Sequence, residues 1–217
     1  MRKMKYSDII IIIMEMIGTI AFAVSGAVTG IQKKMDLFGV TVLGVCTAVG
    51  GGMIRDLLLG VNPPNLFIDS KYAFTAIVTS ILLFLILYIR RKQLPDHYPM
   101  KVDRMLLIGD TIGLGIFTVM GSYAAVKCGF AEHRFLTMFV GVLTGVGGGV
   151  MRDVLAGNTP YILVKHIYAV ASLAGALTFT LILPVVGWLP AMIIGAILVM
   201  VIRLLAAHYR WNLPRIQ

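Results

Sequence analysis

The stretch Gly50-Gly-Gly-Met-Ile-Arg-Asp-Leu-Leu-Leu-Gly60 occurs a second time, slightly altered, as Gly147-Gly-Gly-Val-Met-Arg-Asp-Val-Leu-Ala-Gly157. Each copy places three consecutive glycines one helical turn before an Arg-Asp pair and ends on a further glycine. The copies lie 97 residues apart, and the prolines that follow, Pro63 and Pro160, keep that spacing. A motif as specific as GGGxxRDxxxG rarely arises twice by chance, so it indicates an internal duplication.

The similarity continues on both sides of the motif. Upstream, residues 95 positions apart match, namely Glu15 with Asp110, Gly18 with Gly113, Phe22 with Phe117 and Gly26 with Gly121. Downstream, Tyr72-Ala73 matches Tyr168-Ala169. The duplicated unit therefore extends well beyond the glycine motif.

Composition places the chain in a membrane. Of its 217 residues 59% are apolar and 13% are charged, and the mean hydropathy is +0.91. A soluble domain carries roughly 25% charged residues, so a soluble enzyme, a nucleic-acid-binding module and a disordered chain are excluded. The net charge of +9 is explained by Lys and Arg in short loops, which fix the orientation of a membrane protein.

Runs without charges, or with a single one, mark the membrane spans, because a helix needs about 20 apolar residues to cross a bilayer. These runs are 9–31, 37–54, 72–89, 105–126, 135–151 and 167–202. The last run is too long for one helix, and Pro184, Gly187 and Pro190 predict a break that divides it into two. The sequence thus predicts seven spans.

Each duplicated unit holds three spans, an odd number, so the second unit enters the membrane from the opposite side. We predict an all-α integral membrane protein with seven transmembrane helices. Its parts are a first three-helix repeat over 9–89, a second, inverted three-helix repeat over 105–183, and a seventh helix over 190–207. Inverted repeats are typical of proteins that move solutes, with the site at the repeat interface.

The distribution of basic residues predicts the orientation. Six Lys and Arg fall on the side of the N-terminus, and eleven, Arg203 among them, fall on the opposite side. Because positively charged loops stay in the cytoplasm, we expect a multi-pass cell-membrane protein with its N-terminus outside and its C-terminus cytoplasmic. The basic run Arg90-Arg91-Lys92 either attracts anionic lipid or serves topology alone.

Glycine triplets interrupt the second and fifth spans. Their members are Gly50, Gly51 and Gly52, and Gly147, Gly148 and Gly149. Each glycine weakens a helix by about 1 kcal/mol relative to alanine, so we expect these spans to kink or unwind there. Unwound backbone at membrane depth must be buried in protein or line a wet cavity, which favours a solute pathway. The alternative is close helix packing, which small residues permit.

Charges inside the spans need partners or a cavity. They are Glu15, Arg55, Asp56, Asp110, Arg152 and Asp153. We expect one ion pair between Glu15 and Arg55 near the outer mouth and an inverted one between Asp110 and Arg152 near the inner face. These pairs either line and gate the two mouths or clamp the structure. The aspartate beside each arginine instead pairs locally or caps backbone amides.

Patterns typical of catalysis are missing from the sequence. Cys46 and Cys128 form no CxxC motif, and no GxxxxGK[ST] phosphate loop occurs. We therefore predict that the protein is not an enzyme, and we expect no catalytic residue, metal site or cofactor.

The two GGGxxRD motifs, the segment from Gly18 to Gly26 with Phe22 and Ser25, and Asp110-x-x-Gly113-Leu114 resemble a known family. It is the bacterial family of trimeric intracellular cation (TRIC) channels, also labelled a glycine transporter domain or an uncharacterised UPF0126-type membrane family. The resemblance covers residues 9 to 205. It implies a homotrimer with one ion pathway in each protomer, flanked by the second and fifth helices, which bend at their glycine triplets. Both Arg-Asp pairs then belong to that pathway, where animal relatives carry lysine-bearing motifs.

Three functions remain open at this point. The first is a passive channel for monovalent cations, above all potassium, which the acidic residues in the spans favour. The second is a transporter of glycine or another small amino acid, because paired Arg and Asp groups beside bare backbone suit a zwitterion. The third is a lipid-binding membrane scaffold without transport activity. We place the channel first.

Overall fold

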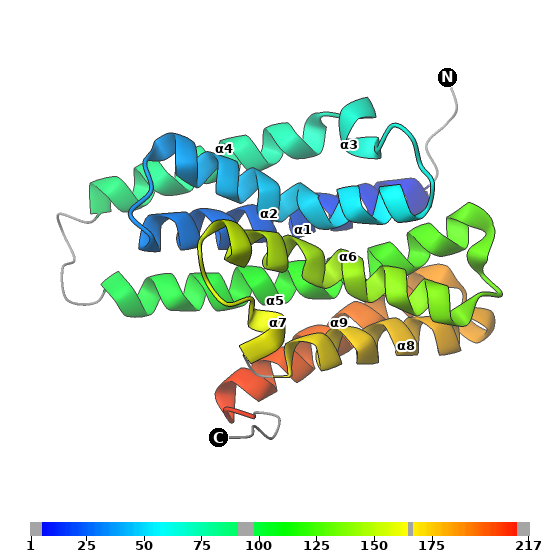
Figure 1. Ribbon diagram of the computed structural model, residues 1–217. Helices are drawn as coiled ribbons and strands as arrows, with labels where there is room; N and C mark the ends of the chain where they lie inside the picture. Colours follow the sequence, from blue (N-terminus) through cyan, green and yellow to red (C-terminus); the bar gives the residue numbers. More distant parts are fainter. Residues whose placement is uncertain (1–5, 91–97, 165–166, 212–217) are drawn as a thin grey trace.

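The bundle contains the seven predicted spans. The computed structural model describes residues 6–90, 98–164 and 167–211, and seven helices in these ranges are long and apolar enough to cross a membrane. They are α1 (Tyr6–Gln32), α2 (Leu37–Leu58), α4 (Lys71–Arg90), α5 (Tyr98–Ala125), α6 (Arg134–Leu155), α8 (Tyr168–Val186) and α9 (Trp188–His208). They lie side by side in one bundle (Figure 1). Arg91 and Lys92 of the basic run lie outside the described residues.

The order of elements repeats in the two halves. A short helix separates the second and third spans of each half, α3 (Asn65–Ile68) in the first and α7 (Tyr161–Val164) in the second, and a π-helix, η1 (Val126–Phe130), extends α5. Helices α1, α2 and α4 pack on one another, as do α5, α6 and α8. The pairs α1–α5 and α2–α6 join the halves, and α9 packs on α5 and α8. Because α2 and α6 run in opposite directions (Figure 1), the halves are inverted repeats with α9 outside them.

The glycine that closes each repeated motif also ends its helix. Gly60 and Gly157 have φ angles of 72° and 65°, in the left-handed region that glycine adopts without strain. The Gly60 amide donates to the Leu57 carbonyl at 3.2 Å, and the next amide donates to the Asp56 carbonyl at 2.8 Å. The same two bonds follow Gly157. This is the Schellman arrangement, and it turns the chain back so that α3 and α7 begin beside the aspartate of the motif.

The predicted break within 167–202 lies at Gly187, which separates α8 from α9 with a φ of 80°. Pro184 lies in the last turn of α8, and Pro190 lies in the first turn of α9. A proline in the first turn is tolerated because the amide it lacks has no partner within the helix. One long apolar run therefore makes two helices.

Of the two predicted effects of the glycine triplets, unwinding is wrong, and a kink stays a prediction. Both triplets lie in uninterrupted α-helix. A Cβ added to Gly51 would overlap the Thr144 carbonyl oxygen of α6, and one added to Gly148 would overlap the Thr47 carbonyl oxygen of α2. The absence of side chains thus lets the two backbones contact each other, and this packing offsets the weak helix propensity of glycine.

The first glycine of each triplet also packs on the helix of the other half. Gly50 faces Met151, and Gly147 lies against Ile54 and Gly51. The third glycine of each triplet has a different environment. A Cβ on Gly52 would meet only Arg55 Nη2, at 3.8 Å, whereas one on Gly149 would lie 2.8 Å from the Tyr168 hydroxyl. The first two glycines of each triplet therefore pack helices, and the third faces the charged groups of its half.

Two phenylalanines complete the contact between the halves. The rings of Phe22 and Phe117, which occupy matching positions in α1 and α5, lie 5.2 Å apart between centroids. Each ring packs on the glycine of the other helix, because a Cβ on Gly113 would overlap Phe22 and one on Gly18 would approach Phe117 to 3.2 Å. The duplicated glycines and phenylalanines thus form a close-packed seam.

Candidate functional site

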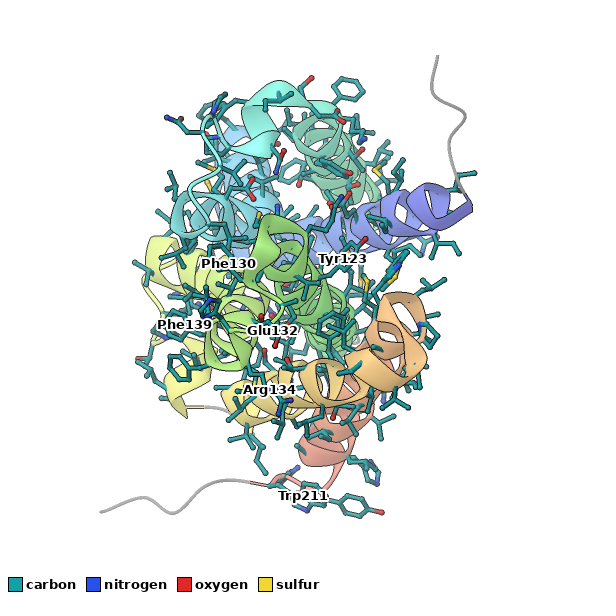
Figure 2. All side chains as sticks on the ribbon, turned by 90° about the vertical axis from the view of Figure 1, so that its right-hand side faces the viewer. Tyr123, Phe130, Glu132, Arg134, Phe139 and Trp211 are labelled. Atoms are coloured by element: carbon teal, nitrogen blue, oxygen red, sulfur yellow. The ribbon has the colours of Figure 1, made fainter. Side chains whose placement is uncertain are left out.

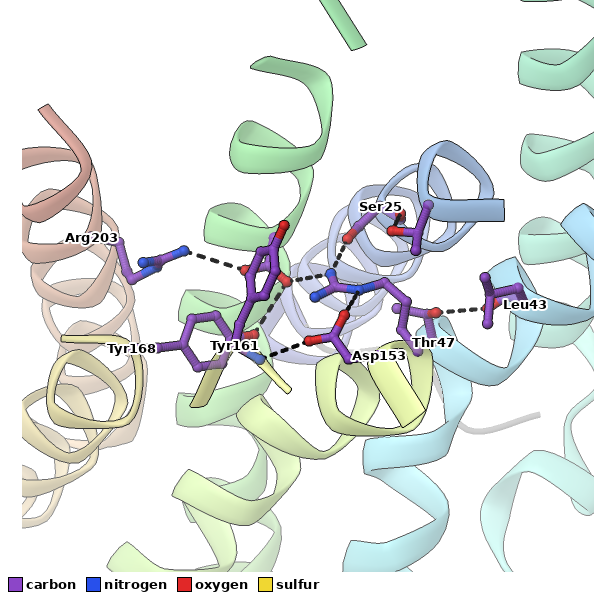
Figure 3. Close-up of polar contacts among 10 residues, drawn as sticks. Ser25, Leu43, Thr47, Asp153, Tyr161, Tyr168 and Arg203 are labelled. Atoms are coloured by element: carbon purple, nitrogen blue, oxygen red, sulfur yellow. Dashed lines mark hydrogen bonds and ion pairs between the residues drawn. The ribbon is translucent and has the colours of Figure 1, made fainter. Parts of the chain in front are cut away.

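A buried ion cluster occupies the second half of the molecule. Arg152 Nη1 donates to Asp110 Oδ1 at 2.7 Å and to the Ser25 hydroxyl, and Arg152 Nε donates to Asp153 Oδ1 at 2.8 Å. The Arg152 and Asp110 side chains are both fully buried. Figure 3 shows these contacts. The predicted ion pair between Asp110 and Arg152 is confirmed.

A second arginine and two tyrosines close the cluster. Arg203 Nη2 of α9 lies 3.5 Å from Asp110 Oδ2, and the Tyr168 hydroxyl donates to Asp110 Oδ1 at 3.2 Å. The Arg203 guanidinium lies 4.7 Å from the Tyr168 ring centroid, and that of Arg152 lies 4.9 Å from the Tyr161 ring (Figure 3). With two arginines and two aspartates the cluster is electrically neutral, as buried charges require.

Arg203 does not serve as a loop charge. The sequence analysis counted it among the basic residues of the cytoplasmic side, but α9 continues to His208 and leaves the Arg203 side chain 1% exposed. Its charge is matched by Asp110 and not by water or lipid. One basic residue must therefore be removed from the eleven that set the predicted orientation.

The aspartate of each repeated motif caps the short helix that follows. Asp56 Oδ2 accepts a hydrogen bond from the Asn65 amide of α3, and Asp153 Oδ2 accepts one from the Tyr161 amide of α7, both at 2.8 Å. The other oxygen of each carboxylate holds the neighbouring arginine. The local pairing predicted for these aspartates is confirmed. They also cap backbone amides, but these amides begin α3 and α7 and were not freed by a kink at the triplets, as the sequence analysis supposed. The RDxxxG motif thus ties a transmembrane helix to the loop after it.

The predicted ion pair between Glu15 and Arg55 is wrong. Arg55 Nε and Nη2 both contact Asp56 Oδ1 at 2.8 Å. Glu15 Oε2 instead accepts a hydrogen bond from the Tyr72 hydroxyl of α4. The Arg55 side chain is 12% exposed near the end of α2. Because the neighbouring Asp56 carboxylate neutralises it, Arg55 does not need Glu15 of α1 as a partner.

A cavity of about 300 Å³ opens beside Glu15. Its walls come from α1, α2, α3, α4, α5 and η1. Its polar lining includes Glu15, Thr19, Arg55, Asp56, Tyr72 and Lys127. Gly52 lies in the wall as well. Figure 2 looks onto this end of the bundle, with Tyr123 and Phe130 at the end of α5 and in η1. The cavity therefore exposes the first-half charges that correspond to the buried cluster of the second half.

Three charged residues, Asp69, Lys71 and Lys127, lie at or beside the mouth of the cavity. Lys71 Nζ contacts Asp69 Oδ2 at 2.6 Å, and the hydrogen bond from Lys71 lowers the pKa of Asp69 below its ordinary value. Lys127 is exposed, and its ammonium lies 5.7 Å from the Tyr123 ring centroid. The mouth thus combines one neutral ion pair with one exposed positive charge.

Five residues whose side chains contact the charged groups of the two sites were not predicted as partners. They are Ser25, Tyr72, Tyr161, Tyr168 and Arg203. A signal for two of the tyrosines was present, because Tyr72-Ala73 matches Tyr168-Ala169 in the duplication. No repeat signal marks Arg203, which lies outside the duplicated units.

Comparison with known proteins identifies the family. A family model described as glycine transporter matches the chain twice, over residues 12–88 and 107–184. The chain belongs to the glycine transporter family. The two matches start and end within α1–α4 and α5–α8 respectively, so each half of the bundle is one copy of the family unit.

Relatives of this family cover nearly the whole chain. The UPF0126 membrane protein of Deinococcus radiodurans is 37% identical over 203 residues, which are 93% of this chain and 89% of the relative. The UPF0126 membrane protein YvgT of Bacillus subtilis is 36% identical over 206 residues, 93% and 94% of the two chains. The glycine transporter family member described here is thus a membrane protein, as its relatives are described, and its seven long apolar helices make it multi-pass.

Solved structures share the fold. One belongs to a study of conductance through TRIC cation channels and is 36% identical, with a TM-score of 0.79 over 94% of this chain and 96% of the other. Another is a TRIC trimeric intracellular cation channel orthologue from Rhodobacter sphaeroides, 30% identical, with a TM-score of 0.82 over 93% and 99%. The fold of this glycine transporter family member is therefore that of the TRIC cation channels.

Proposed function

We propose that this protein is a membrane cation channel, a homotrimer that conducts monovalent cations, above all potassium, through one pathway in each protomer. The observation that carries the proposal is the cavity beside Glu15, which brings carboxylates into contact with a hollow between transmembrane helices. Carboxylates lining a wet path favour cations. The similarity to TRIC cation channels over 93–94% of the chain supports the same assignment.

The proposed pathway follows the charged residues from one half to the other. It enters at Glu15, Arg55 and Asp56 and passes the third triplet glycine of α2, Gly52. Beyond the contact of the first two triplet glycines lie the third glycine of α6 and the Asp110 cluster. Fully buried ion pairs close the second half, so conduction requires that Arg152 separate from Asp110 or that α2 and α6 move past each other.

A carrier for glycine or another small amino acid is the second candidate. The description of the family model favours it, and so does the neighbourhood of the Glu15 carboxylate and the Arg55 guanidinium in one cavity. A zwitterion presents one charge to each of these groups. The site in a carrier lies near the repeat interface and opens alternately to each side.

Electrical recording separates the two candidates. Purified protein is placed in a planar bilayer under a potassium chloride gradient, with and without glycine. Discrete current steps that reverse near the potassium potential support the channel. A silent bilayer with saturable uptake of labelled glycine into liposomes supports the carrier instead. Silence in both assays contradicts transport altogether and favours a lipid-binding scaffold.

The proposal includes an assembly and an orientation. We propose a trimer, by analogy with the structural relatives, and an N-terminus outside the cell. Mass measurement in mild detergent tests the trimer, and a monomer contradicts it.

The orientation is tested with a membrane-impermeant thiol reagent, which is applied to intact cells that carry the C46A variant. Cys128 is exposed and lies in η1, which extends α5 at the end of the bundle where α1 begins (Figure 1). Labelling of Cys128 supports the outside placement, and protection contradicts it.

A further inference from the structure

The duplicated acids Glu15 and Asp110 have unequal sets of partners. Asp110 Oδ1 accepts from Arg152 and Tyr168, and its Oδ2 is held by Arg203. Glu15 Oε2 accepts from Tyr72, the counterpart of Tyr168. Glu15 Oε1 accepts no hydrogen bond from the residues that the structure describes. The first half thus keeps the tyrosine contact of the second half and lacks both arginine contacts.

Two of the positive charges near Glu15 are neutralised by other acids. Arg55 is neutralised by Asp56, and Lys71 is neutralised by Asp69. Lys127 lies exposed at the mouth and over the Tyr123 ring. Within the described residues Glu15 forms no ion pair. Glu15 therefore presents to the cavity a carboxylate that forms no ion pair, and the only positive charge of the described lining outside an ion pair is that of Lys127 at the mouth. Such an acid in a transmembrane helix is expensive without a partner.

We propose that Glu15 and Tyr72 form a binding site for one positively charged group, which takes at Glu15 the place that the Arg203 guanidinium takes at Asp110. The ligand oxygens are Glu15 Oε1 and the Tyr72 hydroxyl, with water in the cavity completing the shell. This inference names the cation site of the proposed pathway and rests on that proposal.

The charge of the lining favours a monovalent ligand. One positive charge neutralises Glu15, whereas a divalent ion leaves an excess of one charge, which adds to the positive charge of Lys127 in the same lining. Oxygen ligands suit an alkali ion. The ammonium group of a small amino acid carries the same charge and hydrogen-bonds to the same oxygens, so potassium and glycine are the two sources of this chemistry.

Binding is measured without any flux. The unfolding temperature of the purified protein in detergent is followed while potassium chloride replaces N-methyl-D-glucamine chloride at constant ionic strength, since a ligand that binds the folded state stabilises it. We expect a saturable rise for the natural chain. In the E15Q variant we expect the apparent potassium affinity to fall roughly tenfold or more, as the loss of one charge contact in a half-buried site implies.

A matched control removes a carboxylate elsewhere. Glu132 is exposed and does not line the cavity, so E132Q keeps the natural potassium dependence. If the E15Q and E132Q variants respond to potassium alike, the proposed site is wrong. A rise with glycine but not with potassium assigns the site to an ammonium group and overturns the alkali-ion assignment.

A second variant tests the correspondence between Arg203 and the cation. R203Q leaves Asp110 Oδ2 without its arginine, so the folded protein is destabilised and gains a second place for a cation. We expect potassium to restore part of the lost unfolding temperature, beyond the rise seen in the natural chain. An R203Q variant that is destabilised and gains nothing from potassium overturns the correspondence.

The two proposals fail in different ways. If the protein conducts cations but its stabilisation by potassium does not depend on Glu15, the proposed binding site is wrong and the proposed channel function is still supported. If potassium stabilises the protein through Glu15 but the protein passes no current, the binding site is supported and the channel function is wrong.

Discussion

Gly51 of α2 and Gly148 of α6 each lie against the backbone of the opposite helix, so that a Cβ on either would overlap a threonine carbonyl of its neighbour. They are the middle members of the two triplets and lie 97 residues apart. The centre of the molecule is thus a backbone-to-backbone contact between the two halves, which only glycine permits.

Alanine at this contact should separate the halves. We expect G51A and G148A each to lower the free energy of unfolding by about 1–3 kcal/mol, the usual effect of overpacking. G52A is the matched control, because its Cβ would meet only the end of the Arg55 side chain at 3.8 Å. Its better helix propensity leaves stability unchanged or raises it by up to about 1 kcal/mol. Denaturant unfolding in mixed micelles measures the free energy of unfolding of all three variants. A loss in G52A as large as that in G51A and G148A contradicts the backbone contact.

A double-mutant cycle should distinguish the two acid–arginine pairs. For Asp110 and Arg152, which are in direct contact at 2.7 Å, we expect a coupling of about 0.5–3 kcal/mol. For Glu15 and Arg55, which form no ion pair, we expect a coupling near zero and no rescue when the two charges are exchanged. A functional rescue by the exchanged pair E15R with R55E would show that the geometry of the first half is wrong.

The same substitution should have unequal effects in the two halves. D153N leaves Arg152 with a weakened partner in a fully buried site, and breaking a buried pair costs about 3–5 kcal/mol. D56N acts on an arginine that is 12% exposed and lines the cavity, where water reaches the guanidinium, so we expect a smaller loss. The difference in unfolding free energy between the two variants measures the asymmetry. Losses of equal size would contradict it.

Several features were predictable because short stretches of the sequence reveal them. They are the transmembrane spans, the duplication and the Arg-Asp pairs. A charge-free run predicts a transmembrane helix, and Asp110 with Arg152 could be paired because both lie in spans. The Glu15–Arg55 pair was predicted in the same way, from the similar depths of the two residues in their spans. It failed because Arg55 has a closer carboxylate on its own helix.

Two other expectations failed for a tertiary reason. Glycine lowers helix propensity locally, but the facing backbone of the other half keeps the triplets helical. Arg203 follows a charge-free run and resembles a topology signal, and only the packing of α9 on α5 brings it to Asp110. Neither effect can be read from a window of neighbouring residues.

Lys127 at the cavity mouth should oppose cation entry. K127Q removes an exposed positive charge from the lining, so we expect single-channel potassium conductance to rise at low salt. The gain should shrink near 1 M salt, where the Debye length is about 3 Å. R134Q is the control, because Arg134 is exposed and does not line the cavity. A gain that is independent of salt contradicts an electrostatic origin.

Arg203 is the contribution of α9 to a molecule that is otherwise built from two equal halves. A symmetric duplicate inserted upside down presents the same path to both compartments and conducts equally in either direction. The Arg203 guanidinium, which comes from outside the duplication, binds Asp110, whereas the matching acid Glu15 faces a cavity. The two ends of the path therefore differ in charge. Inward and outward currents through it should then differ, and the sense of that rectification reports which way the chain lies in the membrane.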